Sequence, residues 1–509
     1  MRTTRRSLLR ATALGGMAAA FSGCERVTRQ ITGFLGEALP ESVGVPSGKS
    51  IDPDFHLLSR AAFGSRPGDL ERLKQMGRQA WLEEQLHPDS INDTACDLRA
   101  ERFESLYFSA GDAYEFRKSV LRNEITRHAV LKAVYSRRQL FEVMVEFWGD
   151  HLNIDLEKGD CIYLKPSDDR DVIRKHALGN FHDLIRASAT SPAMLVYLDG
   201  KSNKVRKGTQ DKPNENYARE LMELHTMGVH NGYTQRDVSE AARCLSGWTF
   251  DATRTFALNR GDAYFRPDWH DDGPKTILGT SIAAGGGQKD LESLVEIVCA
   301  HPSTARFIAT KLCRRFVSPD PPESAIKEAA DAFTSGRGDI KTVLRCILNS
   351  KDFDSSRGLI LKRPFKFVVS ALRATGADTH ADFGLTEALH RMGHGLFQYP
   401  TPDGYPDQEL PWMGTLMWRW NFALALANNN QPGVQIKLSP LLKALGAHRP
   451  IDAGRLFGHF TGRTPTTAEF EAIAQSNALL LASKERDSSE TRAAQAVGLI
   501  LASPAFQRC

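Results

Sequence analysis

The sequence predicts a mainly α-helical protein, a large multi-helix globular body with a small β-ribbon insertion around residues 249–279. Apolar residues recur at three- and four-residue spacing along most of the chain, which is the pattern of amphipathic helices. Gly and Pro interrupt this pattern at short intervals, where one helix ends and the next begins. Only around 249–279 do β-branched and aromatic residues alternate in the manner of strands. With 509 residues, of which 41% are hydrophobic, the chain is long enough to bury a large core.

Residues 1–24 are expected to be a twin-arginine signal peptide and not part of the fold. Arg5-Arg6 is followed by Leu8-Leu9 and by a mildly apolar stretch that is too short to span a bilayer. The tetrapeptide ending at Cys24 resembles a lipobox, so Cys24 is the predicted lipidation site and would anchor the chain to a membrane. Cleavage after Ala20 is the alternative. We expect export by the twin-arginine route, to the periplasm or as an outer-membrane lipoprotein.

Residues 25–50 are expected to form a flexible tether, and residues 51–509 a single large α-helical domain. Helical periodicity begins near Asp52 and resumes after the ribbon insertion. The main irregular feature of the C-terminal third is the segment 398–412. Four prolines, a glycine and two tyrosines in this segment predict a rigid Pro-rich loop.

The segment 137–151 is predicted to be a helix with one strongly apolar face. At about 100° per residue, Leu140, Met144 and Trp148 fall on this face, and His151 falls in its middle. A buried imidazole needs a hydrogen-bond partner. His151 is therefore either a core histidine bonded to a carbonyl group, or a ligand or catalytic residue.

Acidic, amide, arginine and imidazole side chains are densest in the segment 214–248, which is predicted to form a helical hairpin. Gly228 is expected to end its first helix. Thr234, with Asp237 three residues later, is expected to open the second helix as a capping-box variant.

On the first helix of this hairpin, Glu220 and His225 fall on opposite flanks of an apolar stripe. The two side chains therefore cannot bind one ion from this helix alone. We expect the second wall of a site to come from His151 or from His270-Asp271.

The charge distribution, the cysteine spacing and the absence of several common motifs argue against several classes of protein. The net charge of +4 is spread without long basic runs, so nucleic-acid binding is not indicated. The eight cysteines include no CxxC pair, and we expect core residues instead of a zinc knuckle or redox dithiol. The sequence also has no GxSxG, HExxH or P-loop motif, and no dinucleotide-binding GxGxxG in the right context.

Motifs from about Phe55 to Phe506 resemble those of domain of unknown function family 1800, a family of large exported bacterial proteins. In order, these motifs are HLL at 56–58, AFG at 62–64, FW at 147–148 with His151, PAML at 192–195, LD at 198–199, NENYAREL at 214–221, GYT at 232–234, Asp237, AR at 242–243, GW at 247–248, HD at 270–271, HP at 301–302, ARF at 305–307 and PDGYP at 402–406. The resemblance implies export and a helical fold, and it implies no particular activity. Members often have a histidine where this chain has Gly149 and an asparagine where it has Gly200, which weakens a metal site built on those positions.

Two functions of different classes fit these observations. The first is a cell-envelope enzyme, such as a metal-dependent hydrolase, with a carboxylate and histidine site in a helical cleft. Its candidate residues are His151, Glu220, His225, His270, Asp271 and Asp403. A divalent metal is the first cofactor considered and a haem the second, although no CxxCH attachment motif is present. The second function is a non-catalytic, lipid-tethered scaffold that binds another exported protein, with the polar cluster fixing helix packing.

Overall fold

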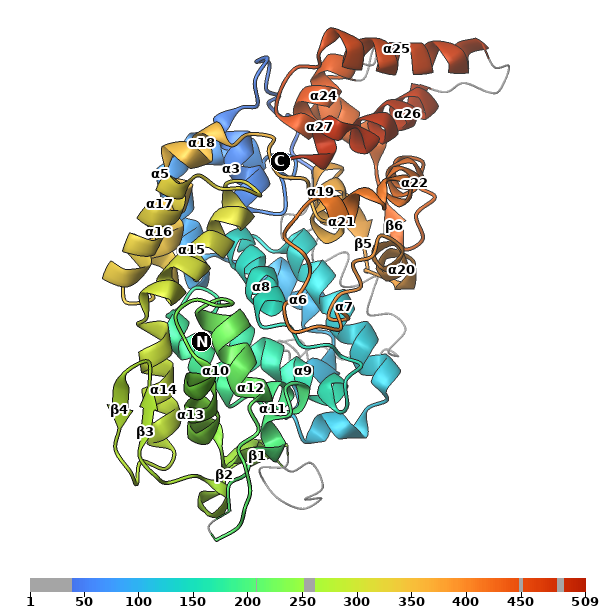
Figure 1. Cartoon of the computed structure of the whole chain (residues 1–509). Helices are drawn as coiled ribbons and strands as arrows, with labels where there is room; N and C mark the ends of the chain where they lie inside the picture. Colours follow the sequence, from blue (N-terminus) through green and yellow to red (C-terminus); the bar gives the residue numbers. More distant parts are fainter. Residues whose placement is uncertain (1–38, 207, 251–260, 448–451, 483–488) are drawn as a thin grey trace.

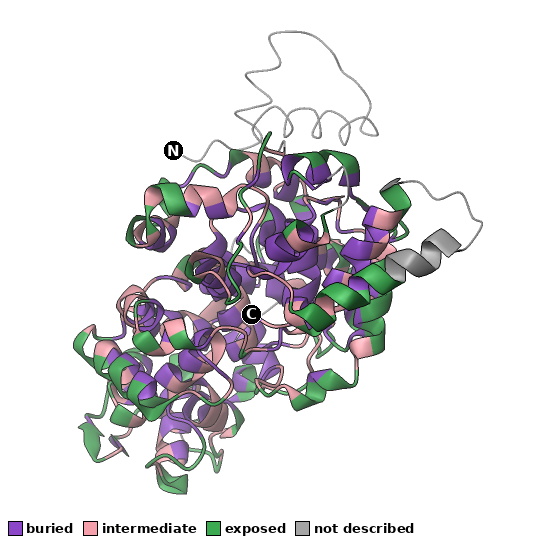
Figure 2. Cartoon of the chain, turned by 90° about the horizontal axis from the view of Figure 1, so that it is seen from above, coloured by how far each residue is buried: buried purple, intermediate pink, exposed green. Residues whose placement is uncertain are grey.

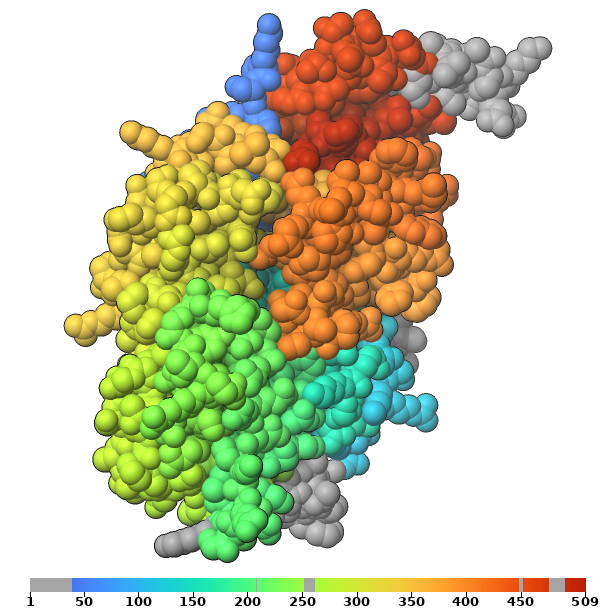
Figure 3. Space-filling view, viewed as in Figure 1, coloured from blue at the N-terminus to red at the C-terminus, as the bar shows by residue number. Residues whose placement is uncertain are grey.

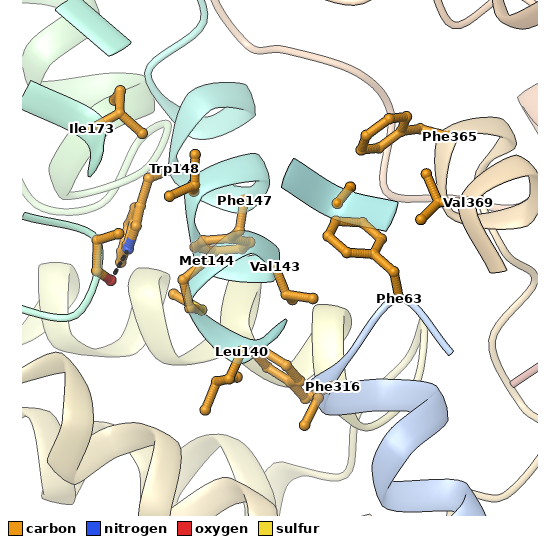
Figure 4. Packing of buried hydrophobic residues seen from close by; sticks show 14 of the residues in the cluster. Phe63, Leu140, Val143, Met144, Phe147, Trp148, Ile173, Phe316, Phe365 and Val369 are labelled. Atoms are coloured by element: carbon orange, nitrogen blue, oxygen red, sulfur yellow. Dashed lines mark hydrogen bonds between the residues drawn. The ribbon is translucent and has the colours of Figure 1, made fainter. Parts of the chain in front are cut away.

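Helix α8 (Gln139–His151) runs through the middle of the molecule (Figure 1). The computed structural model describes residues 39–206, 208–250, 261–447, 452–482 and 489–509. Leu140, Met144 and Trp148 lie on the buried side of α8, as their spacing predicts. The indole Nε1 of Trp148 donates a hydrogen bond to the Ala177 carbonyl oxygen at 3.0 Å (Figure 4).

The helices before α8 form the first group. The side chain of Asp52 caps the first of them by accepting from Asp54 N and Phe55 N, at 2.9 and 3.1 Å. The elements of this group are α3 (Pro53–Ala61), α4 (Asp69–Met76), α5 (Arg78–Leu86), η2 (Pro88–Ser90), α6 (Thr94–Ala100), η3 (Glu104–Tyr107), η4 (Asp112–Glu115) and α7 (Lys118–Tyr135).

The second group contains the predicted helical hairpin. The capping box of Thr234 and Asp237 is present, which confirms the predicted start of the second helix of the hairpin. The elements are α9 (Cys161–Asp168), η5 (Asp169–Arg174), α10 (Phe181–Ala189), α11 (Pro192–Tyr197), η6 (Gly200–Ser202), α12 (Asn216–Glu220), η7 (Leu221–Thr226), α13 (Gln235–Leu245) and η8 (Pro267–Trp269). Both η5 and η7 are π-helical turns. Such turns are rare in proteins, and those that occur are often found at functional sites.

The third and fourth groups complete the body on either side of α8. The third group consists of α14 (Lys289–Cys299), α15 (Pro302–Phe316), α16 (Glu323–Ser335), α17 (Ile340–Leu348) and α18 (Lys351–Ser355). The fourth consists of α19 (Pro364–Ala374), α20 (Phe383–Arg391), α21 (Leu410–Met413), α22 (Leu416–Ala427), α23 (Leu438–Ala444), α24 (Ala453–Thr461), α25 (Thr467–Ala482), α26 (Ser489–Ala502) and α27 (Pro504–Gln507). Every residue of α19 is buried, so this helix is the central element of its group.

The strands of the described residues form short antiparallel pairs, which confirms a mainly α-helical protein with small β-ribbons. The predicted insertion contains two separate hairpins. The first pairs β1 (Trp248–Phe250) with β2 (Ala263–Phe265), and the second pairs β3 (Lys275–Ile277) with β4 (Thr280–Ile282). Residues 251–260 of the predicted ribbon lie outside the described residues. The pairing of β5 (Asp378–Thr379) with β6 (Val434–Gln435) was not predicted, since two-residue strands leave no periodicity.

Buried hydrophobic side chains from all four groups form one contiguous cluster that extends from Val43 to Phe506. Figure 2 shows this buried interior in purple, with exposed residues on the outer helices. Residues 25–50 are predicted to form a flexible tether, but part of this range, around Val43, packs against the folded body. Val43 is buried, and its N–H donates to the Ala444 carbonyl oxygen at 2.8 Å. The cysteines of the described residues are free, and all of them except Cys346 are buried.

None of the helices in the described ranges is both long enough and apolar enough to cross a membrane.

Candidate functional site

A cleft lies where the end of α8, helix α15, the start of α19 and the Pro-rich loop meet. Figure 3 shows it as a hollow between the yellow and orange segments, with cyan atoms of the earlier chain at its floor. The cavity has a volume of ≈ 40 Å³ for water-sized molecules. One water needs about 10–15 Å³ in this measure, so the cavity takes roughly three waters or one oxyanion group such as phosphate or carboxylate.

The Pro-rich loop is held against the end of α8 by polar contacts. Gly404, with φ of 74°, lies so close to Asp150 that a Cβ at this position would come within 2.3 Å of the Asp150 carbonyl oxygen. The Tyr405 N–H donates to Asp150 Oδ1 at 2.7 Å. Asn153 Nδ2 donates to two carbonyl oxygens of the loop, at 2.8 and 2.9 Å. The loop therefore forms a fixed wall of the cleft.

The carboxylates that line the cleft all have cationic partners. Glu146 pairs with Arg315 at 2.6 Å, Asp150 with Arg363 at 2.7 Å, Asp407 with Arg363 at 2.5 Å and Glu409 with Arg508 at 2.8 Å. All four carboxylates are thus engaged in ion pairs, with Arg363 shared by two of them.

Three cations that line the same cleft have no such partner. Within the described part of the chain, no carboxylate oxygen lies within 4.0 Å of the side-chain nitrogens of Lys311, Arg314 or Lys366. Burial lowers the pKa of Lys311, although the charges of Asp407 and Asp150 oppose this effect. Both of those carboxylates are bonded to Arg363. Five Lys and Arg side chains and four carboxylates line the cleft, so cationic side chains are in excess by one.

Lys366 is the most unusual of these cations. It is 5% exposed, within the otherwise mostly apolar helix α19. Its Nζ has one long hydrogen bond of 3.5 Å, to the Arg60 carbonyl oxygen. Burial lowers the pKa of Lys366 from 10.5 to about 7; the charge near Cys509 opposes this, whereas Arg315 and Arg60 add to it. A lysine with a pKa near 7 in a cleft can gain and lose a proton at neutral pH.

His151 and His225 meet behind the cleft. His151 lines the cleft, and its Nε2 donates to the His225 carbonyl oxygen at 3.0 Å, with ring centroids 6.2 Å apart. Burial, followed by the charge of Lys311, lowers the pKa of both imidazoles, that of His225 to about 3. Both histidines are therefore neutral. His151 Nδ1 and both ring nitrogens of His225 are buried without a hydrogen-bond partner.

His225 lies in the π-helical turn η7 and is buried there. Met227 N–H donates to the Met222 carbonyl oxygen at 2.9 Å, five residues back, and this wider turn shifts the side chains from their α-helical positions. The prediction that His225 lies on one flank of the stripe assumed a regular α-helix, and His225 is fully buried in the structure. The second wall beside it comes from His151.

Glu220 and Asp403 are close enough to influence each other. Burial raises the pKa of the half-buried Glu220, and the charges of Glu223 and Asp403 raise it further. Asp403 is an exposed residue of the Pro-rich loop. Neither residue lines the cleft.

His270 and Asp271 lie in a different polar cluster, beside the hairpin β3–β4. His270 contacts the Ser246 carbonyl oxygen through Nδ1 at 2.8 Å and Asp290 Oδ2 through Nε2 at 3.1 Å. Asp271 forms two hydrogen bonds with Arg243, at 2.7 and 3.0 Å, and Arg243 lowers the Asp271 pKa to about 2. These contacts fix the hairpin to α13 and α14, and they do not place His270 near His151.

The six predicted residues therefore fall into three places. In the described ranges, no group of three His, Cys, Asp or Glu side chains is arranged to hold a metal ion. Lys311, Arg314 and Lys366 were missed, since the cleft combines distant segments of the chain. The one available signal was Lys366 itself, because a lysine in an apolar helix is rarely buried without a function or a partner.

The fold and the cleft define a class: a large helical protein with a cleft between α8, α15, α19 and the Pro-rich loop that is lined by more cationic than anionic side chains. A family model described as "Protein of unknown function (DUF1800)" matches residues 56–508, and the chain belongs to this family. Comparison with curated proteins and with solved structures gives no match.

Proposed function

We propose that this protein is an exported enzyme of the cell envelope that binds an oxyanion-bearing small molecule in the cleft and hydrolyses it. The observation that carries the proposal is the set of three unpaired cations, Lys311, Arg314 and Lys366, in a cavity whose carboxylates are all engaged. Lys311 and Arg314 are partly buried and Lys366 is buried. Because no carboxylate oxygen is close to these three side chains, an anion from solution is a partner that the site favours. Arginine and lysine are the usual ligands of phosphate and carboxylate groups.

The size of the cavity supports recognition of one charged group. Its ≈ 40 Å³ is far below the roughly 300–1,000 Å³ of pockets that enclose whole drug-sized ligands. The oxyanion would fill the cavity, and the remainder of the substrate would lie in the open part of the cleft between α15 and the Pro-rich loop.

Lys366 is the residue best suited to move a proton. With a pKa of about 7, part of its amine is neutral at neutral pH and can take a proton from an attacking water. Arg314 and Lys311 would hold the oxyanion, and His151 would form the neutral back wall. The proposal uses no metal ligand set and keeps the hydrolysis expected from the sequence.

Turnover of simple chromogenic esters tests this proposal. We expect hydrolysis of p-nitrophenyl phosphate or p-nitrophenyl sulfate and little hydrolysis of the uncharged p-nitrophenyl acetate. Lys366→Met should lower kcat at least about 100-fold, the effect of a lost general base, whereas Arg314→Gln should mainly raise KM. Lys327→Met, at an exposed ion pair with Asp331, is the matched control. Absence of turnover with every ester would favour the lipid-tethered scaffold instead.

Export is a separate part of the proposal and has its own test. Replacing both Arg5 and Arg6 by lysine should retain the protein inside the cell, because the paired arginines are the feature of the signal that the route recognises. Mass analysis of the mature chain distinguishes a lipidated Cys24 from cleavage after Ala20. A chain that is exported equally well without the arginine pair would refute the predicted route.

A further inference from the structure

Helix α22 is apolar on its outer face as well as on its inner face. Its buried side carries Phe422 and Leu426, and its solvent side carries Met417, Trp420 and Leu424, of which Met417 is 71% exposed. A surface helix of a globular protein normally has charged and polar residues on its outer side. The outer face of α22 therefore lacks the usual solvated surface.

The short helix α21 and the start of α22 extend this surface. We define the apolar face as Leu410, Met413, Met417, Trp418, Trp420 and Leu424, all of them exposed. From Leu410 to Gln431 the one charged residue is Arg419, which is fully buried and donates to the Lys362 carbonyl oxygen at 2.7 Å. None of the residues of the apolar face is itself charged.

Helix α20 lies antiparallel beside α22 and adds another exposed apolar residue. Arg391 at the end of α20 lies over the ring of Trp418, 5.3 Å from its centroid. At the opposite end, Gln431 Nε2 donates to the Gly384 carbonyl oxygen at 3.0 Å. Phe383, next to Gly384 and 71% exposed, therefore lies towards the Leu424 end of the apolar face.

The start of the described chain enters the same part of the molecule. Leu39 packs against Gly376, in the turn between α19 and the strand β5 that leads to α20. Helices α19, α20 and α22 pack against one another. Cys24, the predicted lipidation site, lies 15 residues before Leu39, and a chain of that length spans at most about 50 Å. A lipid at Cys24 would hold this part of the protein close to a membrane.

We propose that the apolar face docks on a lipid bilayer surface. Tryptophan is enriched at the boundary between headgroups and acyl chains, and exposed Leu and Met side chains insert below it. A specific protein interface also contains about one hydrogen bond per 100–200 Å². On this side of α22, Asn421 is the exposed polar side chain, so the helix offers few hydrogen-bonding groups to a partner protein. The chemistry of the face fits acyl chains better than a second protein. This proposal does not depend on the anion cleft.

Flotation with vesicles of phosphatidylethanolamine and phosphatidylglycerol tests the proposal. The full chain carrying Cys24→Ser is used, so that no acyl chain contributes. We expect the protein to float with the vesicles, and the combined variant Met417→Gln, Trp420→Gln, Leu424→Gln to partition about tenfold or more weakly. Val229→Gln, at an apolar residue that is 50% exposed outside the apolar face, should float normally.

Three results would overturn the proposal: no flotation of the parent chain, equal flotation of the combined variant, or a parent dimer that the same substitutions convert to monomers. The last result would identify a second copy of the chain as the occupant. Met417 and Trp420 are exposed, and Leu424, which also packs against Gly498 of α26, is 40% exposed. Circular dichroism checks that the combined variant keeps the fold. Oxyanion binding is measured without lipid, so its failure and a failure of flotation are distinguishable.

Discussion

His151 donates a hydrogen bond from Nε2 to the backbone carbonyl oxygen of His225, at 3.0 Å. The last carbonyl groups of a helix have no partner within the helix, and His225 is near the end of η7. His151 thus satisfies a helix end from a neighbouring helix. This contact joins α8 to the predicted hairpin directly behind the cleft.

Replacing His151 by alanine should lower the free energy of unfolding by about 1–3 kcal/mol, because the His225 carbonyl group would lose its partner in a buried place. Urea denaturation measures this change. His87→Ala is the matched control, since His87 bonds the Glu83 carbonyl oxygen at 2.8 Å on the surface. Equal losses of unfolding free energy in the two variants would show that the buried hydrogen bond of His151 stabilises the fold no more than the exposed one of His87.

Replacing His225 by methionine should leave stability unchanged or raise it by about 1 kcal/mol. Both ring nitrogens of His225 are buried without a partner, and an apolar side chain of similar size removes that cost. The backbone carbonyl group that His151 uses is retained. A loss of more than about 2 kcal/mol would mean that water or a ligand bonds these nitrogens in solution.

Stability should fall as the pH falls below about 6.5, the ordinary histidine value. Burial lowers the pKa of His225 and of His56 to about 3 in the folded protein. Between about pH 6.5 and 3 the unfolded chain binds more protons than the folded chain, so acid favours unfolding. Each such histidine contributes up to about 1.4 kcal/mol per pH unit.

The slope of unfolding free energy against pH measures this effect. His225→Met should reduce the slope by up to about 1.4 kcal/mol per pH unit. Identical slopes for the parent and His225→Met would contradict a neutral buried His225.

Asp290→Asn should destabilise the protein by about 3–5 kcal/mol. The Asp290 carboxylate is 1% exposed and contacts Lys275 Nζ at 2.5 Å and His270 Nε2 at 3.1 Å, so its loss leaves a buried cation unpaired. Thermal unfolding checks this expectation. Asp331→Asn removes an exposed pair with Lys327 and should change stability by less than about 1 kcal/mol. A similar small effect at Asp290 would show that Lys275 is neutral or hydrated.

The helical fold could be predicted because it depends on local periodicity and on capping residues. The capping box of Thr234 and Asp237 predicts the start of a helix from four residues of sequence. The position of Trp148 in the helical repeat predicts which face of its helix is buried. The π-helical turn could not be predicted in this way, since no local pattern distinguishes it from an α-helical turn.

The cleft could not be predicted because it depends on long-range contacts. The Pro-rich loop, Arg363 and Asp150 are separated by up to 257 residues in sequence, and only the folded chain brings them together. His270 and Asp271 were expected as a possible second wall of the site, but their contacts with Asp290 and Arg243 fix a hairpin instead. Lys366, a lysine within an apolar helix, is the better sequence indication of where the cleft lies.

Binding of inorganic phosphate and sulfate, measured by isothermal titration calorimetry without lipid, tests the central claim most directly. We expect one anion per chain, with binding weakened about tenfold or more by Lys366→Met and by Arg314→Gln and unaffected by Lys327→Met. Absence of binding by the parent protein, or unchanged binding by both cleft variants, would contradict an oxyanion site in the cleft.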